Sequence, residues 1–227
     1  MVLSIGCNNQ WGYEHDIVNR TACDVAVFDC TLAAGVAPPA DLQARVKLYP
    51  VCLGEPAAVS ASRQLLKPAG GGRLKYVEAT SEQLRFVNFS QLLALATGGH
   101  TFGDRIRTHR HDNMSDQGGR AAPAPRAARA LRPALLKMDI EGFEWSLLPA
   151  MLASQLAPTQ IAVELHLQTP MQQLPWFGRY KAPAEILALG AMLNRAGYVV
   201  AHRQDNRVCP WCTELLLVRQ HGGYKLD

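Results

Sequence analysis

The sequence lacks the features that mark several classes of protein. Its 227 residues hold no apolar run close to the roughly 20 residues that cross a bilayer, so we expect no membrane span. A full Gly-x-Gly-x-x-Gly run, typical of nicotinamide-binding domains, is also absent. The net charge of +4 is modest, so the composition does not require nucleic-acid binding.

The start of the chain contains no clear targeting signal. Residues 1–6 have neither the basic lead nor the long apolar core of a secretory signal. The first predicted strand begins almost at Met1, so a longer natural N-terminus could be missing. A cytoplasmic and a secretory-lumen location therefore both stay open, as does the oligomeric state.

Length and composition predict one globular domain over residues 1–227. The chain is 48% hydrophobic, which suffices to bury a substantial core. Residues 101–133 interrupt the pattern, because Arg, Ala, Gly, Pro and His crowd together there with few large apolar groups. We expect this insertion to be disordered, with a polyanion or metal patch of its arginines and histidines as the functional alternative. A shorter loop is expected at residues 67–73.

Along the rest of the chain, apolar segments of strand character alternate with helical patterns. This alternation predicts an α/β fold with a mainly parallel sheet and an antiparallel hairpin at one edge. The expected strands are residues 2–6, 25–29, 46–53, 75–79, 135–140, 160–167, 198–201 and 213–219. The expected helices are residues 11–20, residues 144–156 and a segment from Pro183 to a stop at Gly197.

The most informative stretch is an apolar run that ends in three carboxylates around one glycine. Residues 135–140 form the run, and Asp139, Glu141 and Glu144 surround Gly142. Parallel strands covered on both faces are near-continuous apolar runs, and ligands bind at their carboxyl ends. The pattern therefore predicts a buried strand that delivers acids to the rim of a site. For the two glutamates, an acidic first turn of a helix is the alternative.

Two short motifs carry a resemblance to a known family. One is a glycine turn after the first strand, Ser4-Ile5-Gly6-Cys7-Asn8. The other is the acidic segment Lys137-Met138-Asp139-Ile140-Glu141-Gly142-Phe143-Glu144. Together they resemble the Gly-x-Asn turn and the Lys-Ile-Asp-Val/Ile-Glu-Gly-x-Glu segment of FkbM-type S-adenosylmethionine-dependent methyltransferases and their methyltransferase-like relatives. The resemblance implies a Rossmann-like, seven-stranded methyltransferase sheet that binds S-adenosylmethionine.

Part of the implied cofactor site falls on the first two strands. Gly6 permits a close backbone approach to the cofactor, and Asn8 is among the few non-glycine residues that tolerate a left-handed turn. Asp29 ends the second strand about twenty residues after the turn, where an acid accepts hydrogen bonds from ribose hydroxyls. As alternatives, Gly6 serves only the turn and Asp29 only begins a loop.

Further cofactor contacts are implied for three other acids. Glu14 matches the family pattern in the first helix, with an exposed helical acid as the alternative. Asp139 and Glu141 are assigned to the cofactor side of the acidic segment. Ser4 departs from the pattern, because many relatives carry an acid there. This departure puts one contact to the methionine amino group in doubt.

Methyl transfer to a hydroxyl group calls for a general base. His166 is the first candidate by residue type, at the end of a buried strand, and Asp139 and Glu164 are its rivals. Alternation along the strand puts Glu164 and His166 on one face. We expect Asp139 and His166 to line one pocket at neighbouring strand ends. Asp139, Glu141 and His166 could instead hold a divalent ion, a minority interpretation, and we assign no metal.

The cysteines allow a competing interpretation. Cys209 and Cys212 form a Cys-x-x-Cys motif, which can mark redox activity or half of a zinc site. Its loop position lacks the thioredoxin context, so a loop pair, either oxidised or simply thiols, is expected. The remaining cysteines are expected to be small apolar fillers: Cys7, Cys23, Cys30 and Cys52.

These observations favour a methyltransferase that uses S-adenosylmethionine and methylates an oxygen of a small molecule or glycan. A catalytically silent binding module of the same fold is one alternative, because no base is certain. A nicotinamide-dependent oxidoreductase is another. It would share the turn and Asp29, but its full glycine run is missing.

Overall fold

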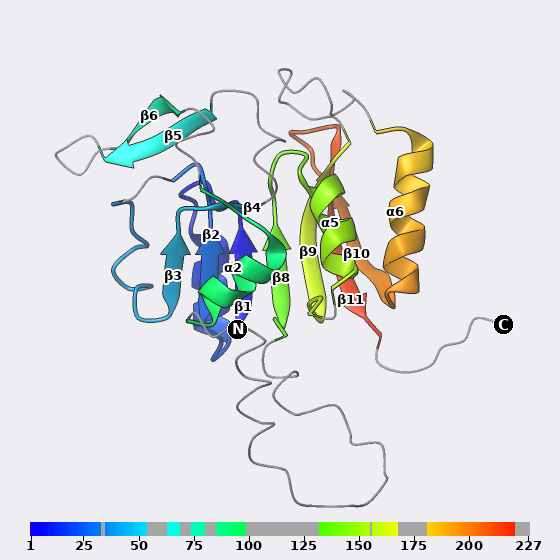
Figure 1. Cartoon of the computed structure of the whole chain (residues 1–227), viewed down its shortest axis with the longest axis horizontal. Coiled ribbons are helices and arrows are strands. Elements are labelled where there is room, and N and C mark those ends of the chain that lie inside the picture. Colours follow the sequence, from blue (N-terminus) through cyan, green and yellow to red (C-terminus); the bar gives the residue numbers. More distant parts are fainter. Residues whose placement is uncertain are drawn as a thin grey trace, which may run out of the picture.

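A computed structural model describes residues 1–32, 35–53, 63–68, 74–79, 85–98, 132–154, 156–167 and 181–220 of the chain (Figure 1). Within these ranges, no helix is long and apolar enough to cross a membrane. The insertion expected at residues 101–133 lies outside the described residues up to residue 131.

A seven-stranded, mostly parallel sheet forms the centre of the fold. Its strands lie in the order β10-β11-β9-β8-β1-β2-β3. The neighbouring strands from β9 to β3 pair in parallel, whereas β11 is antiparallel to both β9 and β10. The α/β class and the antiparallel edge hairpin are thus confirmed. The bounds are β1 Val2–Ile5, β2 Val25–Phe28, β3 Val46–Tyr49, β8 Leu135–Met138, β9 Gln160–His166, β10 Tyr198–Asp205 and β11 Cys212–Arg219.

The chain reverses its direction across the sheet between β1 and β8. From β1 it moves outward through β2 to β3, and it later returns to β8 on the other side of β1. In open α/β sheets, ligands bind at such a reversal, outside the carboxyl ends of the strands. Gly6 directly follows β1 and Asp139 directly follows β8. These residues therefore flank the expected binding position.

Alternate side chains of the core strands belong to two apolar clusters. In β1, Leu3 and Ile5 join the larger apolar cluster, whereas Val2 belongs to the smaller one. The larger cluster includes residues of α2 (Phe89–Ala96), α5 (Glu144–Leu152) and α6 (Pro183–Arg195). Figure 1 shows α2 and α5 across the front of the sheet. The smaller cluster packs against α1 (Gly12–Arg20). Cover on both sides explains why β1 is buried along its whole length.

Two small sheets lie beside the main one, and they correct the strand expected at residues 46–53. That segment divides into β3 and β4 (Cys52–Leu53), and β4 pairs in parallel with β7 (Phe86–Val87). Pro50 stands between the two parts and has no N–H to donate to the ladder. A hairpin of β5 (Arg63–Pro68) and β6 (Leu74–Ala79) forms the other sheet. Residues 67 and 68 of the expected loop therefore belong to β5, and residues 69–73 lie outside the described residues.

Several element ends differ from the sequence prediction. The helix expected at residues 144–156 ends at Leu152, where Ser154 Oγ accepts from the backbone N–H of Leu156 at 3.4 Å. Such local turns compete with helix propagation. The strand expected at residues 198–201 extends to Asp205, because it pairs with β11 almost to the connecting loop.

Helix α2 was missed by the sequence prediction, although its start carries a signal. The Asn88 side chain accepts from the backbone N–H of Gln91, and the Gln91 side chain accepts from the backbone N–H of Asn88. This is a capping box, in which a polar residue precedes Gln or Glu by three positions. The apolar residues Phe89, Leu92 and Leu93 that follow are buried.

Candidate functional site

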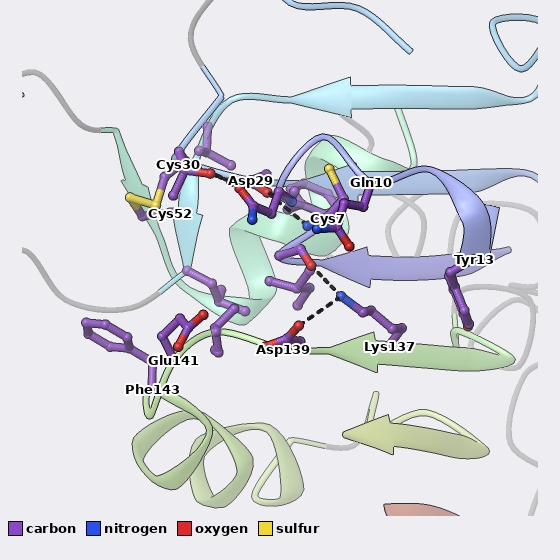
Figure 2. Close-up of a pocket in the computed structure, with 18 of the residues that line it drawn as sticks. Cys7, Gln10, Tyr13, Asp29, Cys30, Cys52, Lys137, Asp139, Glu141 and Phe143 are labelled. Carbon is purple, nitrogen blue, oxygen red and sulfur yellow. Dashed lines mark hydrogen bonds and ion pairs between the residues drawn. A yellow bond between two sulfur atoms is a disulfide. The ribbon is translucent and has the colours of Figure 1, made fainter. Parts of the chain in front are cut away.

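A cavity of about 460 Å³ lies at the reversal point between β1 and β8 (Figure 2). Its lining includes the turn after β1, the end of β2, the start of α1 and the acidic segment after β8. The volume falls within the roughly 300–1,000 Å³ of small-molecule and cofactor sites. Of the residues expected at the site, the following line it: Gly6, Asn8, Glu14, Asp29, Asp139 and Glu141.

The turn after β1 needs glycine at its first position. Gly6 has φ +75°, and an added Cβ would lie 1.8 Å from the carbonyl oxygen of Asp139. Asn8 and Asn9 continue the turn with φ 46° and 57°, which are left-handed values that asparagine tolerates. The Lys137 ammonium donates to the carbonyl oxygen of Gly6, which ties the turn to β8. Glycine thus allows the turn to pass close to the backbone of Asp139, and the turn lines the cavity.

Asp29 holds this turn in place. Its Oδ2 accepts from the backbone N–H groups of Cys7 at 2.9 Å and Asn8 at 2.6 Å. Its Oδ1 accepts from the backbone N–H of Thr31 at 2.8 Å and from the Thr31 hydroxyl at 2.5 Å. A carboxylate offers about four lone-pair positions. The described contacts occupy that capacity, so the geometry favours a turn-holding role, and the expected ribose contact stays a prediction.

A disulfide forms part of the cavity wall and corrects the expectation that Cys30 and Cys52 are apolar fillers. Their sulfur atoms are bonded, which links the loop after β2 to β4 (Figure 2). The residues are 22 positions apart, and no local motif signals their pairing. Cys209 and Cys212 form a second disulfide, the oxidised form of the expected loop pair. Cys7 is a buried thiol, and burial raises its pKa, so it stays protonated.

The acidic segment after β8 turns sharply as it enters the cavity rim. Glu141 and Gly142 both have positive φ, 57° and 102°, so the backbone bends between Asp139 and Glu144. Asp139 lies 3.8 Å from Lys137, and its side chain is 37% exposed. Burial raises the pKa of Asp139 to about 6, although the charge of Lys137 opposes this shift. An aspartate with this pKa can exchange a proton near neutral pH.

His166 lies behind the acidic segment in a cluster of carboxylates. Its Nδ1 is 3.1 Å from Glu144 Oε1 and its Nε2 is 3.4 Å from Glu141 Oε2. Glu144 Oε1 also accepts from the backbone N–H of Ile140. Burial opposes the charge of His166, but the hydrogen bond to Glu144 and the nearby carboxylates outweigh it and raise its pKa to about 9. His166 is therefore a buried cation at neutral pH.

The expected pairing of Asp139 with His166 is partly met. β8 and β9 are parallel neighbours, and ligand-capable atoms of Asp139, Glu141 and His166 all lie within 4.8 Å of one another. Among the described residues, however, neither His166 nor Glu164 lines the cavity. Glu164 instead accepts from the Asn206 amide at 2.8 Å. The base assigned to His166 stays a prediction, and of the three candidate bases only Asp139 lines the cavity among the described residues.

Two groups of side chains have spacings that a metal ion could bridge. One is Asp139, Glu141 and His166, and the other is Glu164, His166 and Cys212. In the second group, Cys212 is held in a disulfide and has no thiolate to offer, and in the first group both ring nitrogens of His166 lie within ion-pair distance of carboxylates. We therefore interpret the first group as an ion-pair cluster that fixes the acidic segment.

This ion-pair cluster predicts a specific loss of stability at alkaline pH. The pKa of His166 in the folded chain, about 9, exceeds the value near 6.5 of an unfolded histidine. Its stabilisation is thus complete below about pH 6.5 and is lost as the pH rises through about 9, for a total of about 3 kcal/mol. In urea melts at several pH values across this range, the free energy of unfolding should fall more steeply with pH for the wild type than for His166→Asn.

A matched control for this experiment is His202→Asn, because His202 is exposed on β10. It should follow the wild-type curve. Parallel curves for wild type and His166→Asn would show that His166 is neutral in the folded chain.

Sequence reasoning missed the roles of Lys137 and Glu144. Both residues belong to the acidic motif, but no local sequence pattern indicates that Lys137 donates to Gly6 or that Glu144 contacts His166. Each contact spans two strands or a strand and a helix. Only the topology brings the partners together.

Comparisons with known proteins do not add a family. No protein-family model matches the chain, and no curated protein matches it.

Proposed function

We propose that the chain is an S-adenosylmethionine-dependent methyltransferase of the FkbM type, which transfers a methyl group to an oxygen of a small molecule or glycan. One observation carries the proposal. The glycine turn after β1 and the acidic segment after β8 meet at one cavity, at the reversal point of the sheet. The antiparallel edge hairpin also agrees with the Rossmann-like methyltransferase sheet that the motifs imply.

The volume of the cavity and the glycine turn that lines it suit this cofactor. At Gly6 a side chain would collide with the backbone of Asp139, so glycine lets the turn pass close to the acidic segment, and both segments line the cavity. When bound, the cofactor supplies a methyl group already activated by its sulfonium. The chain contributes position and electronegative surroundings from Asp139 and Glu141 at the rim.

Asp139 is the residue that we assign to accept the acceptor's proton. It lines the cavity, it is partly exposed, and its pKa is raised to about 6. His166 is already protonated at neutral pH and cannot take a proton there. We assign it to hold Glu141 and Glu144, which fixes the segment that carries Asp139.

This assignment predicts the pH profile of turnover. With the best acceptor from a panel of hydroxylated small molecules and glycans, the rate should rise up to about pH 6 and then level off, because Asp139 must be ionised. Asp139→Asn should lower turnover by roughly 100-fold or more. Asp41→Asn, which removes a 68% exposed carboxylate, is the control and should leave the rate unchanged. An unaltered profile in Asp139→Asn would remove Asp139 as the base.

A catalytically silent module of the same fold remains the second candidate. The observation that favours it is His166, whose two ring nitrogens both face carboxylates, so that this histidine is not free to act as a base. Cofactor binding without turnover on the whole panel would select this candidate.

The disulfides bear on the acceptor class. Two disulfides within the described residues are typical of proteins that fold in an oxidising compartment. Such compartments hold many glycans, so the disulfides favour a glycan acceptor over a cytosolic metabolite.

Mass spectrometry of ligands that copurify with the native protein tests the proposal. We expect S-adenosylmethionine or S-adenosylhomocysteine in the extract. A nicotinamide dinucleotide in their place would instead select the oxidoreductase, whose full glycine run the sequence lacks.

A further inference from the structure

The loop between β10 and β11 brings a cysteine pair to the end of β9. Cys209 and Cys212 form the disulfide of this loop, with Cys209 partly exposed and Cys212 buried. Cys212 begins β11 and lies directly opposite His166, which ends β9. Residues opposite each other on antiparallel strands have Cβ atoms about 4.5–5.5 Å apart. A Cys-x-x-Cys pair can supply half of a zinc site, and the fold places a histidine beside it.

Glu164 adds an oxygen to this group. Ligand-capable atoms of Glu164, His166 and Cys212 all lie within 4.8 Å of one another. Asn206 connects the two sides of the group, because its amide donates to Glu164 at 2.8 Å and its Oδ1 accepts from the backbone N–H of Cys209 at 3.1 Å. Together with Cys209, the group offers two sulfurs, one nitrogen and one oxygen. Structural zinc sites are closed by four protein ligands of these kinds.

The carboxylates around His166 favour a cation at this position. Its Nδ1 lies 3.1 Å from Glu144 Oε1, and its Nε2 lies 3.4 Å from Glu141 Oε2. The other oxygen of Glu144 is buried and has no hydrogen-bond partner among the residues that the structure describes. A zinc-bound histidine usually donates from its second ring nitrogen to a carboxylate, and Nδ1 with Glu144 has that arrangement. Nε2, with the longer contact, is thus the nitrogen suited to an ion.

We propose that the reduced form of this loop binds Zn²⁺ through Cys209, Cys212, His166 and Glu164. A dithiol reductant supplies two electrons and two protons, which break the Sγ–Sγ bond to give two thiols while the reductant becomes a disulfide. Zinc binding then releases one proton from each thiol and the proton on Nε2 to water. The disulfide and the zinc ion are alternative ways to close the loop, and zinc also joins it to β9.

This zinc site is independent of the proposed methyl transfer. Among the described residues, none of its four ligands lines the cavity at the reversal point of the sheet. A site with four protein ligands has no open position for a substrate, so its role is structural.

Cobalt titration of the whole chain tests this site, because Co²⁺ takes the place of Zn²⁺ and reports sulfur ligands by a charge-transfer absorption band. A phosphine is the reductant, since dithiols themselves chelate metals. The reduced chain should bind one Co²⁺ with the charge-transfer intensity of two thiolates, and Zn²⁺ should displace it. The oxidised chain, which has the same sequence, should give no band.

Variants separate the four-ligand site from a cysteine pair that binds metal alone. His166→Asn and Glu164→Gln should each lower the Co²⁺ affinity of the reduced chain by roughly 100-fold or more, because loss of even an outer partner of a ligand costs about 10–100-fold. His202→Asn is the matched control. His202 is the histidine closest in sequence to the cysteine pair, but it is exposed on β10, so this variant should bind Co²⁺ as the wild type does.

A second control addresses the other disulfide. Cys30→Ser combined with Cys52→Ser should keep the band, and Cys209→Ser should lose it. Circular dichroism checks that each reduced chain is folded. The proposal is wrong if the reduced chain gives no band, or if it unfolds on reduction even with Zn²⁺ present. It is also wrong if His166→Asn and Glu164→Gln both keep full affinity, or if the band depends on Cys30 and Cys52.

Discussion

Gly6→Ala should abolish cofactor binding and destabilise the fold more than any other single methyl group added at the site. Gly6 has φ +75°, and the new Cβ would lie 1.8 Å from the carbonyl oxygen of Asp139. Either the turn or β8 has to move, and strain and overpacking of this kind each cost about 1–3 kcal/mol. A displacement of about 1 Å at a site costs on the order of 100-fold in function. Urea melts and titration with S-adenosylhomocysteine measure both effects.

Gly190→Ala serves as the control for an added methyl group. Gly190 lies on α6, and a Cβ there meets nothing within 4 Å. Alanine favours the helix by about 1 kcal/mol over glycine, so this variant should be slightly more stable and should bind normally. Normal binding by Gly6→Ala would mean that the turn does not approach the ligand.

Asp29→Asn should be the second most damaging change. The substitution keeps the shape but removes the charge, and it turns one acceptor oxygen into a donor that faces N–H or O–H groups. Asp29 is 4% exposed and accepts from Cys7, Asn8 and Thr31. The free energy of unfolding should fall by about 3 kcal/mol, and cofactor affinity should fall with it because the turn loosens.

Asp24→Asn is the control for this charge. Asp24 precedes the same strand at its other end, and its side chain is 81% exposed. It should change stability by less than about 0.5 kcal/mol. If Asp29→Asn binds S-adenosylhomocysteine with full affinity, Asp29 neither holds the turn for the ligand nor binds the ribose.

The sequence predicts the main sheet better than its surroundings. β1 and β2 are buried at every position, and the apolar residues of β8 and β9 are buried at alternate positions, so hydrophobic runs and periodicity identify these strands directly. The prediction of one strand at residues 46–53 is wrong because Pro50 interrupts the apolar run. Helix α2 was missed although its capping box is visible in the sequence.

The sequence predicted which strand ends come together, whereas the roles of the residues there stay predictions. Gly6, Asp29 and Asp139, which follow β1, β2 and β8, line one cavity. Their partners come from elsewhere in the chain, so no local pattern encodes them. Glu14, for example, is buried and accepts from the Ser4 hydroxyl, ten residues away in the sequence. The protonation of His166 likewise depends on two glutamates that the turn at Gly142 brings beside it.

Calorimetric titration of the wild-type chain, with S-adenosylhomocysteine and oxidised nicotinamide adenine dinucleotide as competing ligands, tests the central proposal most directly. We predict saturable binding of one S-adenosylhomocysteine per chain with a dissociation constant of about 1–10 μM, or about −7 to −8 kcal/mol, and no binding of the dinucleotide. A folded chain that binds the dinucleotide and ignores S-adenosylhomocysteine would contradict the proposed function.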